Sequence, residues 1–104
     1  MDEVVVSAVV PAKEGQVDAL VEAFTAHTAA VHAEDGCVLY AAHRADVGVL
    51  VIERWSSAAA LDAHSRGAAL AQLGAAVRPF VAGPSTVIRA SAVPSGDTEK
   101  GALG

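Results

Sequence analysis

Residues 37–55 read CVLYAAHR-ADVG-VLVIERW, two apolar runs rich in β-branched and aromatic residues that flank four residues of turn character. Such runs are typical of β-strands, and a link this short requires the second strand to turn back and pair with the first. This segment therefore predicts a β-hairpin with strands at 37–44 and 49–55.

The chain before the hairpin supplies one further strand and one helix. Residues 4–10 read VVVSAVV and predict a strand that Pro11 ends. From Gln16 to about Val31 the apolar residues recur at helical spacing, which predicts a single amphipathic helix. Gly36 is placed to stop that helix.

The chain after the hairpin repeats this pattern. Ser56 or Ser57 is placed to cap a helix over 58–65, and a second helical stretch over 68–77 ends before Pro79. Residues 85–90 predict the last strand, so that 1–90 form one domain and 91–104 a tail. The order β-α-β-β-α-β predicts an α+β fold of the ferredoxin-like type, a four-stranded antiparallel sheet with helices on one face.

The predicted strands are apolar on both faces. In an antiparallel sheet with one wet face, apolar and polar residues alternate, yet on the first strand Val5 and Val9 oppose Val6 and Val10. The helices can cover only one face, and the other would expose more apolar surface than monomers usually tolerate. A homodimer packed sheet to sheet is the simplest cover, and the alternative is an exposed face of modest hydrophobicity.

Composition limits the partners and the compartment. The 104 residues carry a net charge of −5 with scattered basic residues, so no nucleic-acid partner is expected. A single cysteine, Cys37, permits no internal disulfide and fits a reducing cytoplasm. The acidic start lacks the basic region of a secretory signal, and no apolar run is long enough to cross a membrane. The alanine-, valine- and arginine-rich composition suggests a bacterial source.

Three segments resemble the antibiotic biosynthesis monooxygenase (ABM) domain family. Residues 34–40 (EDGCVLY) are similar to the family's approach to its second strand, and residues 13–16 (KEGQ) to the turn before its first helix. Glu53-Arg54-Trp55-Ser56, followed by residues 60–64 (ALDAH), resembles its Glu-Trp-His signature. The similarity covers about residues 4–90.

This resemblance implies a dimeric α+β barrel in which each subunit holds a pocket between sheet and helices. Characterised members of the family include oxygenases that act on polycyclic phenols, anthrones or quinols without metal or flavin. Related members degrade haem, and many others have no assigned reaction.

The simplest hairpin register pairs Arg44 with Val49, Tyr40 with Glu53, and Val38 with Trp55. Period-two alternation then groups on one sheet face the side chains of Tyr40, Arg44, Glu53 and Trp55. His64, in the following helix, could point back over that face. A phenol, a carboxylate, an indole and an imidazole would thus surround one apolar space, unless the hairpin slips by one residue.

Oxygenation without a cofactor needs a substrate that can itself give an electron to O2, and deprotonation produces such an anion. A base that titrates near neutrality suits this step, and His64 is the best candidate. Tyr40 or Trp55 could hold an aromatic substrate, and Arg44 could stabilise the developing negative charge. These four are the candidate catalytic residues.

The candidate substrate-binding residues are Glu53, Phe24, His27 and Phe80. Each candidate also has a structural interpretation. Glu53 and Trp55 could serve only to hold the fold, His64 could be a satisfied helix residue, and His27 could be a boundary residue of the first helix. The four histidines have no metal-ligand spacing, so no metal site is predicted.

The leading hypothesis is a monooxygenase, an oxidoreductase without cofactor, acting on a small aromatic or quinol-type substrate and O2. The first alternative is haem binding and degradation. It is weakened because Ser7 occupies the likely position of the asparagine that the haem-degrading branch uses. The second alternative is a non-catalytic dimer that sequesters a hydrophobic metabolite.

Overall fold

The computed structural model describes residues 3–103 and has its strands and helical regions in the predicted order. In chain order these are β1 (Val4–Pro11), α1 (Val17–Thr25), α2 (Thr28–His32), β2 (Cys37–Ala45), β3 (Gly48–Trp55), α3 (Ala58–Ser65), α4 (Ala68–Val77), the 3₁₀ turn η1 (Arg78–Phe80) and β4 (Thr86–Ala90).

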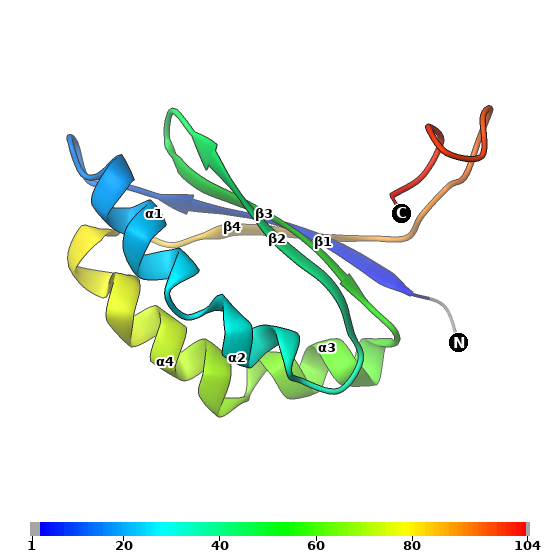
Figure 1. Ribbon diagram of the computed structural model, residues 1–104, viewed down its shortest axis with the longest axis horizontal. Helices are drawn as coiled ribbons and strands as arrows, with labels where there is room; N and C mark the ends of the chain where they lie inside the picture. Colours follow the sequence, from blue (N-terminus) through cyan, green and yellow to red (C-terminus); the bar gives the residue numbers. More distant parts are fainter. Residues whose placement is uncertain (1–2, 104) are drawn as a thin grey trace.

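The strands form one antiparallel sheet in the order β2-β3-β1-β4, and all the helices lie on the same face of it (Figure 1). Strand β1 pairs with both β3 and β4, so β1 and β3 are central and β2 and β4 are edges. This is the ferredoxin-like α+β fold that the order of elements predicts.

The hydrophobic core lies between the sheet and the helices. The central strands contribute side chains at alternate positions, as a pleated strand requires: Val6, Ala8, Val49, Val51 and Trp55. The helices contribute the apolar side of each segment: Leu20, Phe24, Val31, Leu61, Leu73 and Val77. The core is therefore formed where the apolar side of the helices packs against one face of the sheet.

The single helix expected from Gln16 to Val31 is wrong, because the chain breaks it at Ala26 and His27 into α1 and α2. The His27 N–H bonds to the Phe24 carbonyl three residues back, which tightens the turn. The hydroxyls of Thr25 and Thr28 also donate to backbone carbonyls of this region, and such bonds compete with the helical ladder.

The hairpin register is confirmed over most of its length, with Arg44 paired to Val49 and Tyr40 to Glu53. The predicted pairing of Val38 with Trp55 is wrong. A bulge between Cys37 and Leu39 makes Val38 the extra residue, and Cys37 takes the place opposite Trp55. The bulge lies beyond the Tyr40–Glu53 pair, so the side chains of that pair keep the predicted face.

The turn into α3 has the predicted cap. Ser57 is the N-cap residue, and its hydroxyl accepts a hydrogen bond from the Ala60 N–H at 3.1 Å. Of the two serines considered, Ser57 therefore fills the position that precedes the helix.

We call the sheet surface opposite the helices the outer face; its side chains include Val5, Ser7, Val9, Ala41, His43, Leu50, Ile52, Arg54 and Ile88. No described element covers its centre (Figure 1). On the edge strand β4, Ile88 is 58% exposed. The outer face is therefore largely apolar and open to solvent in the single chain.

The segment after β4 runs away from the helices, beyond the far end of the sheet (Figure 1). It contains a turn in which the Asp97 carboxylate accepts hydrogen bonds from the N–H groups of Glu99 and Lys100. Within residues 3–103, no helix has both the length and the apolar character that crossing a membrane requires.

Candidate active site

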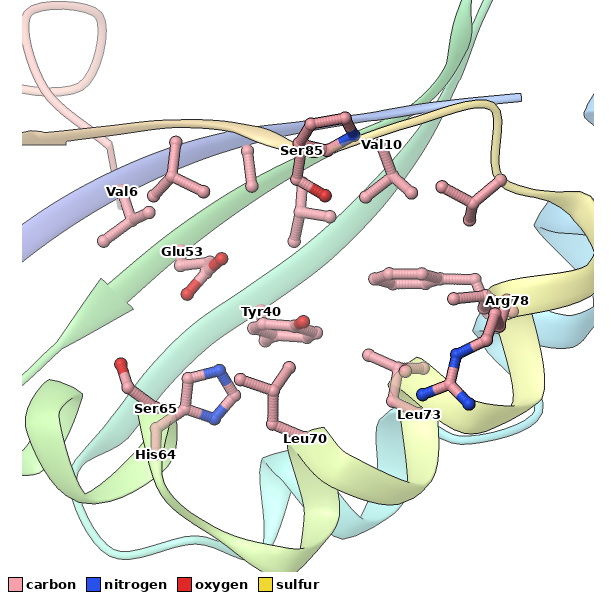
Figure 2. Close-up of a pocket in the computed structure, with 18 of the residues that line it drawn as sticks. Val6, Val10, Tyr40, Glu53, His64, Ser65, Leu70, Leu73, Arg78 and Ser85 are labelled. Atoms are coloured by element: carbon pink, nitrogen blue, oxygen red, sulfur yellow. The ribbon is translucent and has the colours of Figure 1, made fainter. Parts of the chain in front are cut away.

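A cavity of about 750 Å³ opens between the inner face of the sheet and the helices. Its volume is in the range of cavities that hold small-molecule ligands. Most of the side chains that line it are apolar, among them Val6, Ala8, Val10, Phe24, Val51, Leu61, Leu70, Leu73 and Val77. Three of its polar side chains, Tyr40, Glu53 and His64, project into one end of the cavity (Figure 2).

His64 lies in the last turn of α3 and is only 4% exposed. Its ring stacks on that of Trp55, with centroids 4.4 Å apart, and meets the Tyr40 ring edge-on at 5.6 Å. Its Nδ1 atom lies 2.7 Å from Oε1 of Glu34, at the end of the segment that follows α2. The imidazole is thus fixed by two aromatic rings and one carboxylate.

The Glu34 contact determines which ring nitrogen of His64 can act as a base. A carboxylate only accepts hydrogen bonds, so Nδ1 is the nitrogen that donates to Glu34, and in the neutral imidazole the free lone pair is on Nε2. Among the described residues, Nε2 has no hydrogen-bond partner. Every fully buried side-chain nitrogen or oxygen of these residues does have one, so Nε2 is not fully buried. His64 lines the cavity, and Nε2 is accessible from it.

Glu53 is a carboxyl group in the core, 5% exposed, on the central strand β3. Its Oε1 atom accepts a 2.9 Å hydrogen bond from the Trp55 indole N–H. Burial raises the pKa of Glu53 above its ordinary value of 4.5, and the Trp55 bond and nearby His64 oppose that shift. Glu53 thus holds its proton to higher pH than an exposed glutamate does.

Tyr40 lies on β2 directly opposite Glu53, and its ring stacks on Phe24 with centroids 6.1 Å apart. Burial, and secondarily the charge of Glu53, raises the pKa of the Tyr40 phenol well above its usual value. Its hydroxyl therefore stays protonated at any physiological pH. It can donate a hydrogen bond to a ligand in the cavity, but it cannot serve as the base.

The structure brings together four of the residues singled out from the sequence, namely Tyr40, Glu53, His64 and Phe24, all of which line the cavity. Trp55 is fully buried behind His64 and does not line it. Its contacts are the stack on His64 and the bond to Glu53, so it positions both polar side chains.

The other three predicted residues are not part of the cavity lining. Arg44 is on the expected sheet face, but it lies at the hairpin end and is exposed, where it pairs with Asp18 of α1. His27 is half-buried at the break between α1 and α2. Phe80 packs against the core from η1.

Two residues of the site were missed. Glu34 was noted only as part of the motif before β2, and its contact with His64 joins positions 30 residues apart in sequence. Arg78 lines the cavity from the start of η1. The sequence analysis gave Arg78 no role, although an arginine directly after an apolar helix was the available signal.

The haem-branch arrangement does not fit this cavity. Ser7, the position compared with that branch's asparagine, pairs with Ile52 and belongs to the outer face. The β1 side chains that line the cavity are Val6, Ala8 and Val10, none of which can supply an amide. Within residues 3–103, no cluster of three potential metal ligands occurs.

A family model described as antibiotic biosynthesis monooxygenase matches residues 3–76 of the chain. No curated protein matches the sequence. A solved structure from Caulobacter crescentus, provisionally described as an antibiotic biosynthesis monooxygenase, is 27% identical, with a TM-score of 0.77 over 88% of this chain and 91% of its own.

Two further structures are similar in fold. Rv0793 from Mycobacterium tuberculosis is 28% identical, with a TM-score of 0.75 over 91% of this chain and 99% of its own. A protein from Nitrosomonas europaea with the same provisional description has a TM-score of 0.77 over 86% of this chain and 89% of its own. The Nitrosomonas europaea protein is only 15% identical, so its similarity to this chain is one of fold alone.

Proposed function

The chain belongs to the antibiotic biosynthesis monooxygenase family, and on that premise we propose that it is a monooxygenase that needs neither metal nor flavin. Its substrate is an aromatic molecule of the polycyclic phenol, anthrone or quinol type, and its co-substrate is O2. One observation carries the proposal: the buried His64, held by Glu34, directs a free Nε2 atom at an apolar cavity.

The first step is removal of a proton from an activated C–H or O–H of the substrate by His64 Nε2. The Glu34 carboxylate favours this step because it stabilises the imidazolium that forms, 2.7 Å from Nδ1. The Trp55 and Tyr40 rings prevent the imidazole from turning away. The product is a delocalised carbanion or phenolate, which is electron-rich enough to reduce O2.

The second step joins the substrate anion to O2. The new C–O bond gives a peroxide anion, which takes the proton from imidazolium and becomes a hydroperoxide. Loss of the remaining hydrogen from the same carbon breaks the O–O bond and leaves a carbonyl and water. For an activated methylene the sum is CH2 + O2 → C=O + H2O, so the substrate supplies all four electrons.

Two other polar groups of the cavity support these steps. The Tyr40 hydroxyl, which stays protonated, is a donor for the developing oxyanion or peroxide. Glu53, whose pKa is raised, can hold a proton near the reacting atoms without placing a full negative charge beside them. The apolar walls admit O2 and exclude water from the reactive intermediate.

The test is O2 uptake by chelator-treated, flavin-free protein with a panel of anthrones and quinols. We expect consumption of O2 and, with isotopically labelled O2, one labelled oxygen in the product. His64→Ala should lower the rate roughly 100- to 10,000-fold, the usual contribution of a general base. Glu34→Gln should have a smaller effect, because the amide still contacts Nδ1 but cannot stabilise the imidazolium.

His43→Ala is the matched control, because His43 lies on the outer face and, within residues 3–103, its side chain bonds only to the Leu50 carbonyl. Its rate should equal that of the wild type. If the cavity binds these compounds but none of them leads to O2 uptake, the chain is a binding module and the proposal fails. An unchanged rate in His64→Ala would remove His64 from the mechanism.

A further inference from the structure

Arg78 is a cationic side chain that lines the cavity, and its guanidinium has no ion-pair partner among residues 3–103. Within residues 3–103, three other arginines are paired with carboxylates: Arg44 with Asp18, Arg54 with Glu3, and Arg89 with Asp62. Arg89 also lines the cavity, but its guanidinium is 3.0 Å from Asp62. In the described part of the chain, Arg78 is thus the cavity's one arginine without an ion pair.

The backbone holds Arg78 firmly in this place. Leu73 and Val77 anchor the end of α4 in the core, and Pro79 prevents the helix from continuing. The turn η1 is then tied down, because the Phe80 carbonyl accepts a 2.9 Å bond from the Lys13 N–H. The guanidinium therefore extends from a fixed point at the cavity rim (Figure 2).

His64 lies in the last turn of α3, shortly before α4 begins, and Arg78 directly follows the end of α4. Helix α4 has ten residues, so its ends are about 15 Å apart at the usual rise per residue. Between them the cavity is lined by the apolar side chains of Leu70, Leu73 and Val77. The site thus offers a base at one end, a long apolar wall, and a free positive charge at the other end (Figure 2).

We propose that Arg78 determines substrate specificity by binding a carboxylate on the far side of a polycyclic substrate from its reacting carbon. A planar guanidinium matches a carboxylate with two parallel hydrogen bonds, and a nearby apolar wall strengthens their attraction. One unpaired guanidinium compensates one negative charge, so the substrate is a monoanion. The Ser85 hydroxyl, which also lines the cavity, is a second potential donor to the ligand.

This proposal rests on the proposed monooxygenase function, but binding tests it separately from turnover. The probes are anthraquinone-2-carboxylate and its neutral analogue anthraquinone-2-carboxamide, which are already oxidised and cannot react with O2. Binding is followed by the fluorescence of Trp55, the chain's single tryptophan. The wild type should bind the carboxylate more tightly than the amide.

Arg78→Gln should weaken binding of the carboxylate about 10- to 100-fold, the usual worth of hydrogen bonds to a charged group, and leave the amide within about twofold. Arg78→Lys keeps the charge but loses the two parallel donors of the guanidinium, so its affinity for the carboxylate should lie between those of the wild type and Arg78→Gln. Arg66→Gln is the matched control, because Arg66 is exposed in the link between α3 and α4 and does not line the cavity.

Equal binding of the two probes by the wild type, no binding of either, or an equal loss in Arg66→Gln would overturn the role of Arg78. The two proposals can fail separately. If Arg78→Gln selectively loses binding of the carboxylate probe but no anthrone or quinol gives O2 uptake, anion recognition by Arg78 is supported and the monooxygenase proposal fails. If O2 is taken up at a rate that depends neither on a substrate carboxylate nor on Arg78, the monooxygenase proposal is supported and the role of Arg78 fails.

Discussion

Glu53 carries a carboxyl group on a central strand, where most neighbours are apolar. Its one hydrogen bond among the described residues comes from the Trp55 indole, and burial raises its pKa above 4.5. Between pH 4.5 and the pKa of the folded state, the folded chain holds a proton at Glu53 that the unfolded chain has lost. Ionisation at this site therefore destabilises the fold increasingly as the pH rises.

Glu53→Gln removes that ionisation and keeps an oxygen that can accept the Trp55 bond. We expect the free energy of unfolding of the variant, relative to wild type, to increase as the pH rises above 4.5, and then to level off. Urea unfolding at a series of pH values measures this difference. Glu99→Gln, in the exposed tail, is the control and should show no such trend.

The residues of the site were predictable in face but not in position along the strand. Period-two alternation correctly grouped Tyr40 with Glu53, since side chains two apart share a face. It also grouped Arg44 with them, but four residues of strand carry Arg44 about 13 Å farther along the sheet. The Glu34–His64 contact depends on how two helix ends meet, which no local pattern contains.

Among the connections between elements, the turn from α2 to β2 brings Glu34 to α3. Gly36 in this turn has a φ of +81°, and a Cβ there would lie 2.5 Å from the Ala60 Cβ and 2.7 Å from the Ser56 hydroxyl oxygen. Its carbonyl accepts the Ser56 N–H at 2.8 Å. The close approach of this turn to the start of α3 therefore requires glycine.

Gly36→Ala should destabilise the fold more than Gly15→Ala. Both positions have positive φ, which costs about 1–2 kcal/mol for alanine. Only Gly36 adds a clash, because no atom lies within 4 Å of a Cβ at Gly15. Overpacking of this kind usually costs roughly a further 1–3 kcal/mol. Thermal unfolding of both variants gives the comparison, and equal losses would show that the turn can move away from α3.

At this scale most of the fold followed from the sequence. Runs, periods and short links predicted strands β1, β2 and β3, the capped start of α3, the end of α4 before Pro79, and most of the hairpin register. The break between α1 and α2 did not, because neither glycine nor proline marks Ala26 or His27. Nor did the bulge at Val38, since a bulge leaves no trace in a run of apolar residues.

The whole molecule has a cavity on one side of its sheet and a bare apolar surface on the other. The outer face presents Val5, Val9, Leu50 and Ile52 on central strands and Ile88 at the edge. Monomeric proteins rarely leave a contiguous patch of this kind exposed. We propose that a second copy covers it, so that the working molecule is a homodimer with its two sheets packed together.

Ile52→Arg places a charge at the centre of the outer face and should convert the dimer to monomer, because an unpaired charge in an apolar interface is costly. Sedimentation equilibrium at micromolar concentration measures the change in mass. Val47→Arg is the control, as Val47 is 59% exposed in the hairpin turn and lies off that face. A monomeric wild type would contradict the proposal directly.

The position of the cavity on the helix side of the sheet has a consequence for kinetics. In such a dimer the two cavities would face outward, separated by both sheets and by the seam between them. No described cavity residue belongs to the outer face, so neither site would touch the other's substrate. The two active sites should act independently, with hyperbolic saturation and a Hill coefficient of about one.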